Sequence, residues 1–160
     1  MPFTTSKKKH EPFDSFDMII TILPSSANFH AVAYNEMKVE KGVATLLEAQ
    51  NIFGLRPEAF TSEKLRQYFL DYSSRNTHIQ NAQFHVAVSC KGTEYTHEQL
   101  LDIAHRYLKE MGYTDEGQPL LVYAHHDTDN NHIHIITSRV APDGHKIDQT
   151  MRNGVQEQRL

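Results

Sequence analysis

Residues 120–138 read LLVYAHHDTDNNHIHIITS, and this stretch carries the clearest fold signal and the clearest chemistry in the chain. Two apolar segments flank the polar link 127–131, whose five residues suit the loop of an antiparallel β-hairpin. Side chains alternate between the two faces of a strand. His132 and His134 therefore share one face, while the isoleucines that follow each of them enter the core. The sequence predicts a hairpin that carries two imidazoles side by side.

The first strand of this hairpin, residues 120–126, ends on two further histidines. Alternation places His126 on the apolar core side and His125 on the face of the other pair. Neutral imidazole is the commonest metal ligand in proteins, and three histidines leave coordination positions open for substrate or water. We therefore predict a divalent metal site made of His125, His132 and His134. A histidine-rich, pH-sensitive hairpin without a metal is the alternative.

The composition is that of a globular protein. The 160 residues are 39% hydrophobic and 22% charged, which is enough for one domain with its own core. No apolar run approaches the roughly 18–20 residues of a membrane helix, and no secretory signal pattern opens the chain, so we expect no membrane insertion. The single cysteine, Cys90, excludes an internal disulfide and cysteine-rich zinc modules, and it suits a reducing cytoplasm. A net charge of −4 gives no general basic footprint for nucleic acid.

The rest of the chain mixes helical and strand periodicity. Helices are expected in three segments, each opened by a Ser or Thr cap: 25–38, 61–73 and 96–111. Strands are expected at 18–23 and 83–91 and on both sides of the hairpin loop. Segment 43–53 fits either a strand or a helix, and 148–160 is typical of the start of a further helix. We predict an α/β (α+β) fold, in which helices pack on one face of an antiparallel-rich sheet and the active site lies on the open face.

The open face is expected to collect polar side chains around the histidines. From the strands these are His85, Ser89 and Tyr123. In the first helix, the apolar core stripe is expected at Phe29, Val32, Ala33 and Met37. Tyr34 lies roughly 100–130° from the centre of this stripe, and small neighbours leave its hydroxyl accessible to a large molecule. A tyrosine on a helix flank is more often a packing residue, so this position alone does not decide between packing and chemistry.

Three blocks of sequence occur in the order found in a known family. They are Ala33-Tyr34-Asn35 with Lys38 and Gly42, then Phe84-His85-Val86-Ala87-Val88-Ser89, then His125-x-Asp127-x-x-Asn130-x-His132-x-His134. Over roughly residues 18–150, the chain resembles the conjugative relaxases of the MobP class within the HUH endonuclease superfamily. The resemblance is greatest to mobilisation proteins of Bacteroides-type elements.

This resemblance implies a DNA relaxase that nicks one strand at the nic site of an origin of transfer (oriT). Tyr34 would attack a phosphodiester and leave a 5′-phosphotyrosine intermediate. The three histidines of the hairpin would hold Mg²⁺ or Mn²⁺, with Zn²⁺ or Ni²⁺ as substitutes in vitro. Asp127 would act as a base for the tyrosine or would orient His125. The implied function is the conjugative transfer of a plasmid or mobile element.

The same resemblance implies residues and partners that handle the DNA. Ser89, Lys38 and His85 would contact it. The partners would be single-stranded oriT DNA, accessory mobilisation proteins and the coupling protein of a type IV secretion system, in the bacterial cytoplasm. The relaxase domain would cover residues 18–160 after a flexible extension at 1–17. Relaxases usually continue with further helices, so the chain is expected to be truncated before them.

Three other functions are weighed against this one. A rolling-circle replication initiator would use the same chemistry, but its histidine pair usually precedes the tyrosine, whereas Tyr34 precedes His132 here. A three-histidine metallohydrolase would act through metal-bound hydroxide and would not need Tyr34. A non-enzymatic module for single-stranded DNA is disfavoured, because the chain has no tryptophan and is acidic.

Overall fold

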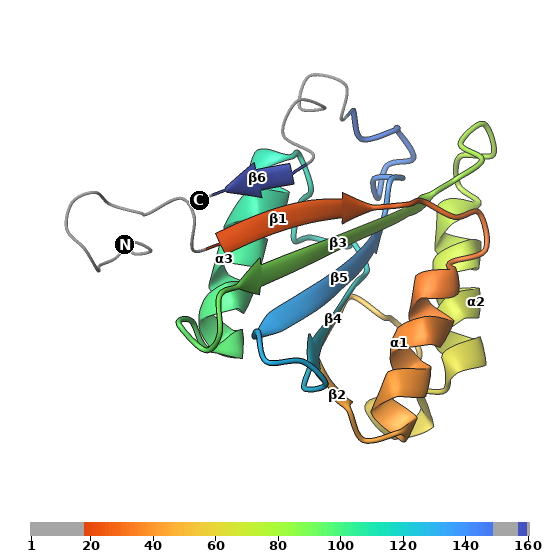
Figure 1. Cartoon of the computed structure of the whole chain (residues 1–160). Helices are drawn as coiled ribbons and strands as arrows, with labels where there is room; N and C mark the ends of the chain where they lie inside the picture. The colour runs from red at the N-terminus through yellow and green to blue at the C-terminus, as the bar shows by residue number, and fades with distance from the viewer. Residues whose placement is uncertain (1–17, 149–156, 160) are drawn as a thin grey trace.

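The computed structural model describes residues 18–148 and 157–159 (Figure 1). Within these residues, six strands form one antiparallel sheet in the order β2-β4-β5-β3-β1-β6. The strands are β1 Met18–Leu23, β2 Ala44–Gln50, β3 Gln83–Cys90, β4 Leu120–His125, β5 His132–Ser138 and β6 Glu157–Arg159. The helices are α1 His30–Glu40, α2 Ser62–Ser73 and α3 His97–Glu110, and a 3₁₀ turn covers Pro57–Ala59. The predicted α+β class with an antiparallel sheet is confirmed.

The β4–β5 hairpin is the one predicted from the sequence. The two strands pair so that His125 lies opposite His132 and Tyr123 lies opposite His134. Residues directly opposite each other share a sheet face, so this register gathers the three histidines on one side. A slip of one residue would turn the fully buried Ile135 onto the histidine face, and the apolar core on the other face therefore holds the register.

Helices cover both faces of the sheet, which differs from the predicted single covered face. One face packs against α3 in a continuous apolar core, and the other packs against α1 and α2 in a second core (Figure 1). The reason lies in β4, whose residues are all buried. Val122 faces the α3 core, whereas Leu121 and Tyr123 face the α1–α2 core. The histidines therefore sit at the loop end of the hairpin, beside α1, rather than on a wholly open face.

Helix α1 begins later than predicted. The predicted caps Ser25 and Ser26 lie before the helix, and the Ser26 hydroxyl instead accepts the Asn28 backbone N–H at 3.0 Å in a preceding turn. The residue before the helix is Phe29, which has a positive φ of 53° and no side-chain cap. Positive φ is uncommon for a bulky residue. Phe29 is fully buried in the α1–α2 core, and this packing replaces a polar cap as the start signal.

The core-facing stripe of α1 is rotated relative to the prediction. Val32 is buried as expected, but Met37 is 39% exposed. Ala31 and Asn35 are buried instead. A prediction from hydrophobic residues alone does not assign an asparagine to the buried face. Asn35 is nevertheless fully buried, because its side chain forms a hydrogen bond with His125 of β4. This rotation leaves Tyr34 on the exposed side of the helix.

The other helices and the ambiguous segment follow the sequence more simply. Helices α2 and α3 start after the predicted caps Thr61 and Thr96, and the predicted capping box of Thr96 with Gln99 is formed. Segment 43–53 contains the edge strand β2, which pairs with β4. No helix among residues 18–148 is long and apolar enough to cross a membrane.

Two predictions concern the ends of the chain. The flexible extension at 1–17 lies outside the described residues, as does most of the helix predicted at 148–160. Residues 157–159 form β6 rather than part of a helix, and they pair with the outer edge of β1. An unpaired strand edge presents a row of free backbone groups, which favours the addition of a strand.

Candidate metal centre

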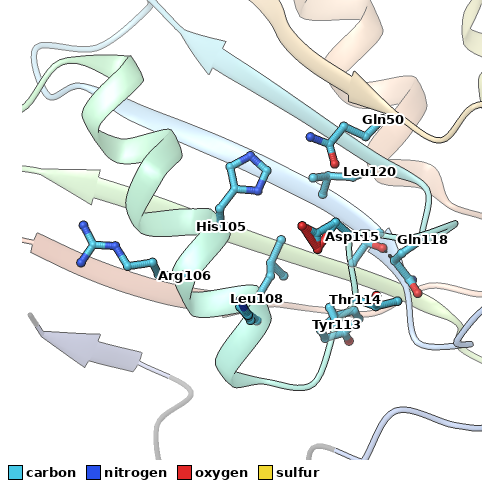
Figure 2. Close-up of a pocket in the computed structure, with 11 residues that line it drawn as sticks. Gln50, His105, Arg106, Leu108, Tyr113, Thr114, Asp115, Gln118 and Leu120 are labelled. Atoms are coloured by element: carbon cyan, nitrogen blue, oxygen red, sulfur yellow. Dashed lines mark hydrogen bonds between the residues drawn. The ribbon is translucent and has the colours of Figure 1, made fainter.

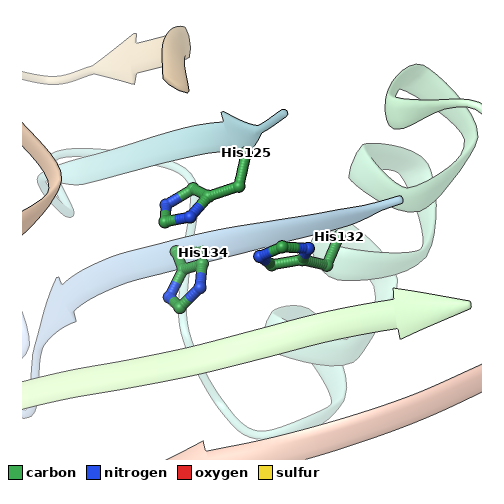
Figure 3. A group of neighbouring side chains, drawn as sticks. All are labelled: His125, His132 and His134. Carbon is green, nitrogen blue, oxygen red and sulfur yellow. The ribbon is translucent and has the colours of Figure 1, made fainter. Parts of the chain in front are cut away.

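Three imidazole rings meet at the loop end of the β4–β5 hairpin (Figure 3). His125 is the last residue of β4, His132 is the first of β5, and His134 follows two residues later. One ring nitrogen from each histidine lies within 4.8 Å of the nitrogens offered by the other two. The rings of His125 and His134 are stacked, with centroids 4.2 Å apart. The structure thus brings together the three ligands predicted from strand alternation.

One nitrogen of each ring is within hydrogen-bond distance of another group of the protein. The pairs are His125 Nε2 with Asn35 Oδ1 at 2.6 Å, His132 Nδ1 with the Asn130 carbonyl oxygen at 3.1 Å, and His134 Nδ1 with His85 Nε2 at 2.8 Å. In metal sites, such a partner orients the ring and leaves its other nitrogen for the ion. The arrangement therefore offers three nitrogen donors to one cation.

Burial keeps the rings of His125 and His134 neutral. Desolvation is the main cause that lowers the pKa of His125 to about 4 and that of His134 to about 2. The neighbouring imidazoles lower both pKa values further, because a second positive charge nearby disfavours protonation. Neutral imidazoles present lone pairs rather than positive charge. The donor set therefore fits a divalent metal cation, and the nitrogens favour a borderline transition metal at least as well as Mg²⁺.

Asp127, predicted as a base or as the partner of His125, is held by Lys38. Its Oδ2 forms an ion pair with the Lys38 ammonium, and its Oδ1 lies 4.0 Å from His125 Nδ1. The hydrogen bond from Lys38 lowers the pKa of Asp127, and the same contact raises the pKa of Lys38. Asp127 is therefore an ionised carboxylate beside the cluster. The close hydrogen bond to His125 is made by Asn35 instead.

Tyr34 lies on the exposed flank of α1, next to this ion pair. The residue is 47% exposed, so its side chain is open to a large substrate. Lys38 lies one helical turn further along, and its Nζ is 5.4 Å from the centroid of the Tyr34 ring. The next residue, Asn35, is buried on the other side of the helix. A single turn of α1 thus presents Tyr34 to solvent and a hydrogen-bond partner to His125.

The two strand residues expected to contact DNA occupy different surroundings. His85 is only 8% exposed, and burial lowers its pKa to about 4. It forms a hydrogen bond with His134, which leaves little of its surface for a direct DNA contact, and the DNA contact of His85 stays a prediction. Ser89 is half-buried and pairs across the sheet with His132, which places it on the histidine face.

A cavity of about 320 Å³ lies away from the histidines, against α3 and the start of β4 (Figure 2). His105, Gln118 and Leu120 are among its lining residues. Leu120 opens β4 and His125 closes it, so the strand separates the cavity from the cluster by roughly 17 Å at about 3.4 Å per residue. The cavity shares no residue with the histidine cluster and does not contribute to it.

The chain matches the family model described as "Relaxase: MobA/VirD2-like, nuclease domain" over residues 34–159. The chain belongs to this relaxase family. The matched residues include Tyr34 and all three histidines of the cluster. No curated protein and no solved structure matches the chain. The relaxase is a metal-dependent nuclease that nicks DNA, and the three histidines are its candidate metal centre.

Sequence analysis missed two residues that shape this centre. Asn35 belongs to the first block of the relaxase resemblance, but nothing in its spacing signals that it is buried against His125. Asn130 acts through its backbone carbonyl on His132, and its side-chain Oδ1 accepts the Gly92 backbone N–H at 2.7 Å. A contact made by a backbone carbonyl cannot be predicted from the residue type. For Asn35, a polar residue on the buried face of α1 would have been a signal, but only if that face had been predicted correctly.

Proposed function

We propose that the relaxase nicks one strand of oriT DNA by attack of Tyr34 on a phosphodiester, with a divalent metal held by His125, His132 and His134. The observation that carries this proposal is the convergence of three oriented imidazoles beside a helix that exposes a tyrosine. A phosphodiester substrate needs both parts, a cation for its charge and an accessible nucleophile.

The proposed step is a transesterification. The Tyr34 phenolate oxygen forms a bond to phosphorus, and the bond from phosphorus to the 3′ oxygen breaks. The departing oxygen keeps the electron pair and takes a proton, which leaves a free 3′-hydroxyl and a 5′-phosphotyrosine. Because one phosphoester replaces another, the strand can be rejoined without an external energy source. A bound metal supplies positive charge that stabilises the phosphate oxygens as they become more negative.

The residues around Tyr34 have distinct proposed roles. A phenol with an ordinary pKa near 10 needs help to ionise at neutral pH. The Lys38 ammonium, 5.4 Å from the Tyr34 ring, favours the phenolate by charge and is available to the DNA phosphates. Asp127 holds Lys38 in place, and its carboxylate is the candidate acceptor for the tyrosine proton. Ser89, beside His132 on the sheet, is the candidate DNA contact near the nick.

We propose that the bound divalent metal is Mg²⁺ or Mn²⁺, and that Zn²⁺ or Ni²⁺, which imidazole ligands also suit, can replace it in vitro. We place the relaxase in the MobP class, among Bacteroides-type mobilisation proteins. The order of the Tyr34, Ser89 and His125–His134 blocks supports that placement. Its partners would be single-stranded oriT DNA, accessory mobilisation proteins and a type IV coupling protein, in the bacterial cytoplasm.

The test is incubation with a library of single-stranded oligonucleotides and Mn²⁺, followed by denaturing electrophoresis. We expect a protein–DNA adduct that resists SDS, requires the metal and disappears with a chelator. Mass spectrometry should find a nucleotide on the peptide that contains Tyr34. Cleaved DNA with no adduct would instead indicate hydrolysis by a metal-bound hydroxide. An adduct on Tyr68 or Tyr72 would reject Tyr34 as the nucleophile.

A further inference from the structure

Asn35 is a polar residue in an apolar position. It is 0% exposed, on the same helix face as the buried Ala31 and Val32. Its side-chain Nδ2 donates to the Ala31 carbonyl oxygen at 2.9 Å, within the helix. This bond settles which way the amide points, because an amide nitrogen donates and a carbonyl oxygen accepts. The Asn35 Oδ1 is therefore an acceptor directed at β4.

The atom that meets this acceptor is a nitrogen of a candidate metal ligand. His125 Nε2 lies 2.6 Å from Asn35 Oδ1, and His125 is itself only 3% exposed. An amide oxygen cannot donate, so the proton of this hydrogen bond belongs to His125 Nε2. In a neutral imidazole the lone pair then lies on Nδ1. In Figure 3, the ring of His125 lies against those of His132 and His134.

We propose that Asn35 is a positioning residue: it fixes the tautomer of His125 so that Nδ1 is the metal-binding nitrogen. The second part of the inference rests on the proposed function of Tyr34. Because Tyr34 and Asn35 are consecutive, the hydrogen bond from His125 joins the metal centre to the helix turn that carries the nucleophile. The backbone of α1 thereby holds the metal site and the nucleophile at a fixed separation.

Two neighbouring contacts between α1 and the hairpin provide a comparison. Tyr123 donates its hydroxyl to Glu36 Oε2 at 2.6 Å, and Lys38 pairs with Asp127. The Glu36 contact joins the same helix to the same strand but touches no histidine of the cluster. A variant at Glu36 therefore disturbs the packing of α1 on β4 without changing the partner of His125. It is the matched control for a variant at Asn35.

The first experiment needs no variant and no DNA. Nitrogen-15 NMR of the histidine side chains in the metal-free full chain reports which ring nitrogen carries the proton. We expect His125 to be protonated on Nε2, and addition of Zn²⁺ to shift its Nδ1 resonance. A His125 protonated on Nδ1 would overturn the proposal, whatever the fate of Tyr34.

The second experiment measures Mn²⁺ affinity by calorimetry for three variants. Removal of a residue that orients a metal ligand typically lowers the metal affinity by about 10–100-fold, and we expect a loss of this size in the Mn²⁺ affinity of Asn35→Ala. Asn35→Asp keeps an acceptor for Nε2 and should bind Mn²⁺ to within about threefold of the unmodified chain. The control Glu36→Ala, which removes the acceptor of the Tyr123 hydroxyl, should leave Mn²⁺ affinity unchanged.

Equal losses in Asn35→Ala and Glu36→Ala would show a general effect of helix packing and would reject the proposal. Unchanged Mn²⁺ affinity in Asn35→Ala would also reject it. If Asn35→Ala fails to fold, the tautomer measurement and Asn35→Asp still decide. None of these measurements involves DNA cleavage, so a failure of Tyr34 as the nucleophile would be seen separately.

Discussion

The two faces of the β4–β5 hairpin carry adjacent residues and do different work. On the face toward α3, Val122, Ile133 and Ile135 are buried in the hydrophobic core. On the face toward α1, the same two strands carry His125, His132 and His134 at their loop end. One position along the chain therefore separates a residue that stabilises the fold from one that serves the chemistry. Strand alternation keeps these two tasks apart.

The largest effect on metal binding with little effect on stability is expected at His134. His134→Ala should weaken Mn²⁺ binding by more than about 100-fold, because one of three nitrogen donors is lost. The free energy of unfolding should change little, since the cluster is costly to desolvate and its rings are not core hydrocarbon. Calorimetry and urea unfolding measure the two quantities. The matched control is His126→Ala: His126 is exposed and contacts Thr45 Oγ1 at 3.0 Å, so Mn²⁺ binding should persist.

The adjacent residue should behave in the opposite way. Ile135 is fully buried in the α3 core, so Ile135→Ala should lower the free energy of unfolding by about 2–5 kcal/mol. The folded protein should still bind Mn²⁺ with near-normal affinity, because the histidine face is untouched. Urea unfolding with calorimetry at low temperature tests this pair of expectations. If folded Ile135→Ala lost the metal as completely as His134→Ala, the separation of the two faces would be wrong.

A smaller effect is expected from acid, and the buried histidines on the histidine face contribute to it. Burial lowers the pKa of His85 and of His125 to about 4, below the usual 6.5. Well above pH 6.5 these histidines are neutral in both the folded and the unfolded chain, so the free energy of unfolding does not vary with pH through them. As the pH falls from 6.5 toward 4, the unfolded chain takes up protons first and the free energy of unfolding decreases. The slope is at most about 1.4 kcal/mol per pH unit for each histidine.

Urea unfolding at a series of pH values between 7.5 and 4.5 measures this slope. His85→Asn should reduce it, because one buried histidine no longer titrates. Identical slopes in the unmodified chain and His85→Asn would contradict the assignment of His85 to a buried position behind His134.

The same comparison explains what the sequence predicts and what it does not. The alternation of 120–138 is sufficient for the hairpin, its register and its three histidines, because period-two patterning reports faces directly. Coverage of both faces was not predicted, although the apolar Leu121 and Tyr123 on the histidine face indicate it. A hydrophobic stripe predicts the buried face of a helix only when every buried residue is apolar. Because Asn35 is buried, the core-facing side of α1 differs from the predicted one. Helix α1 starts where Phe29 packs into the core, and a search for capping residues cannot predict such a start.

The central claim is that an exposed tyrosine on α1 reacts with DNA while the histidine face holds the metal. Tyr34→Phe removes one oxygen from a residue that is 47% exposed, so stability and Mn²⁺ affinity should remain near those of the unmodified chain. On an oligonucleotide that the unmodified relaxase cuts in the presence of Mn²⁺, this variant should form no adduct and should not cut. Cleavage by Tyr34→Phe at the rate of the unmodified relaxase would contradict the account.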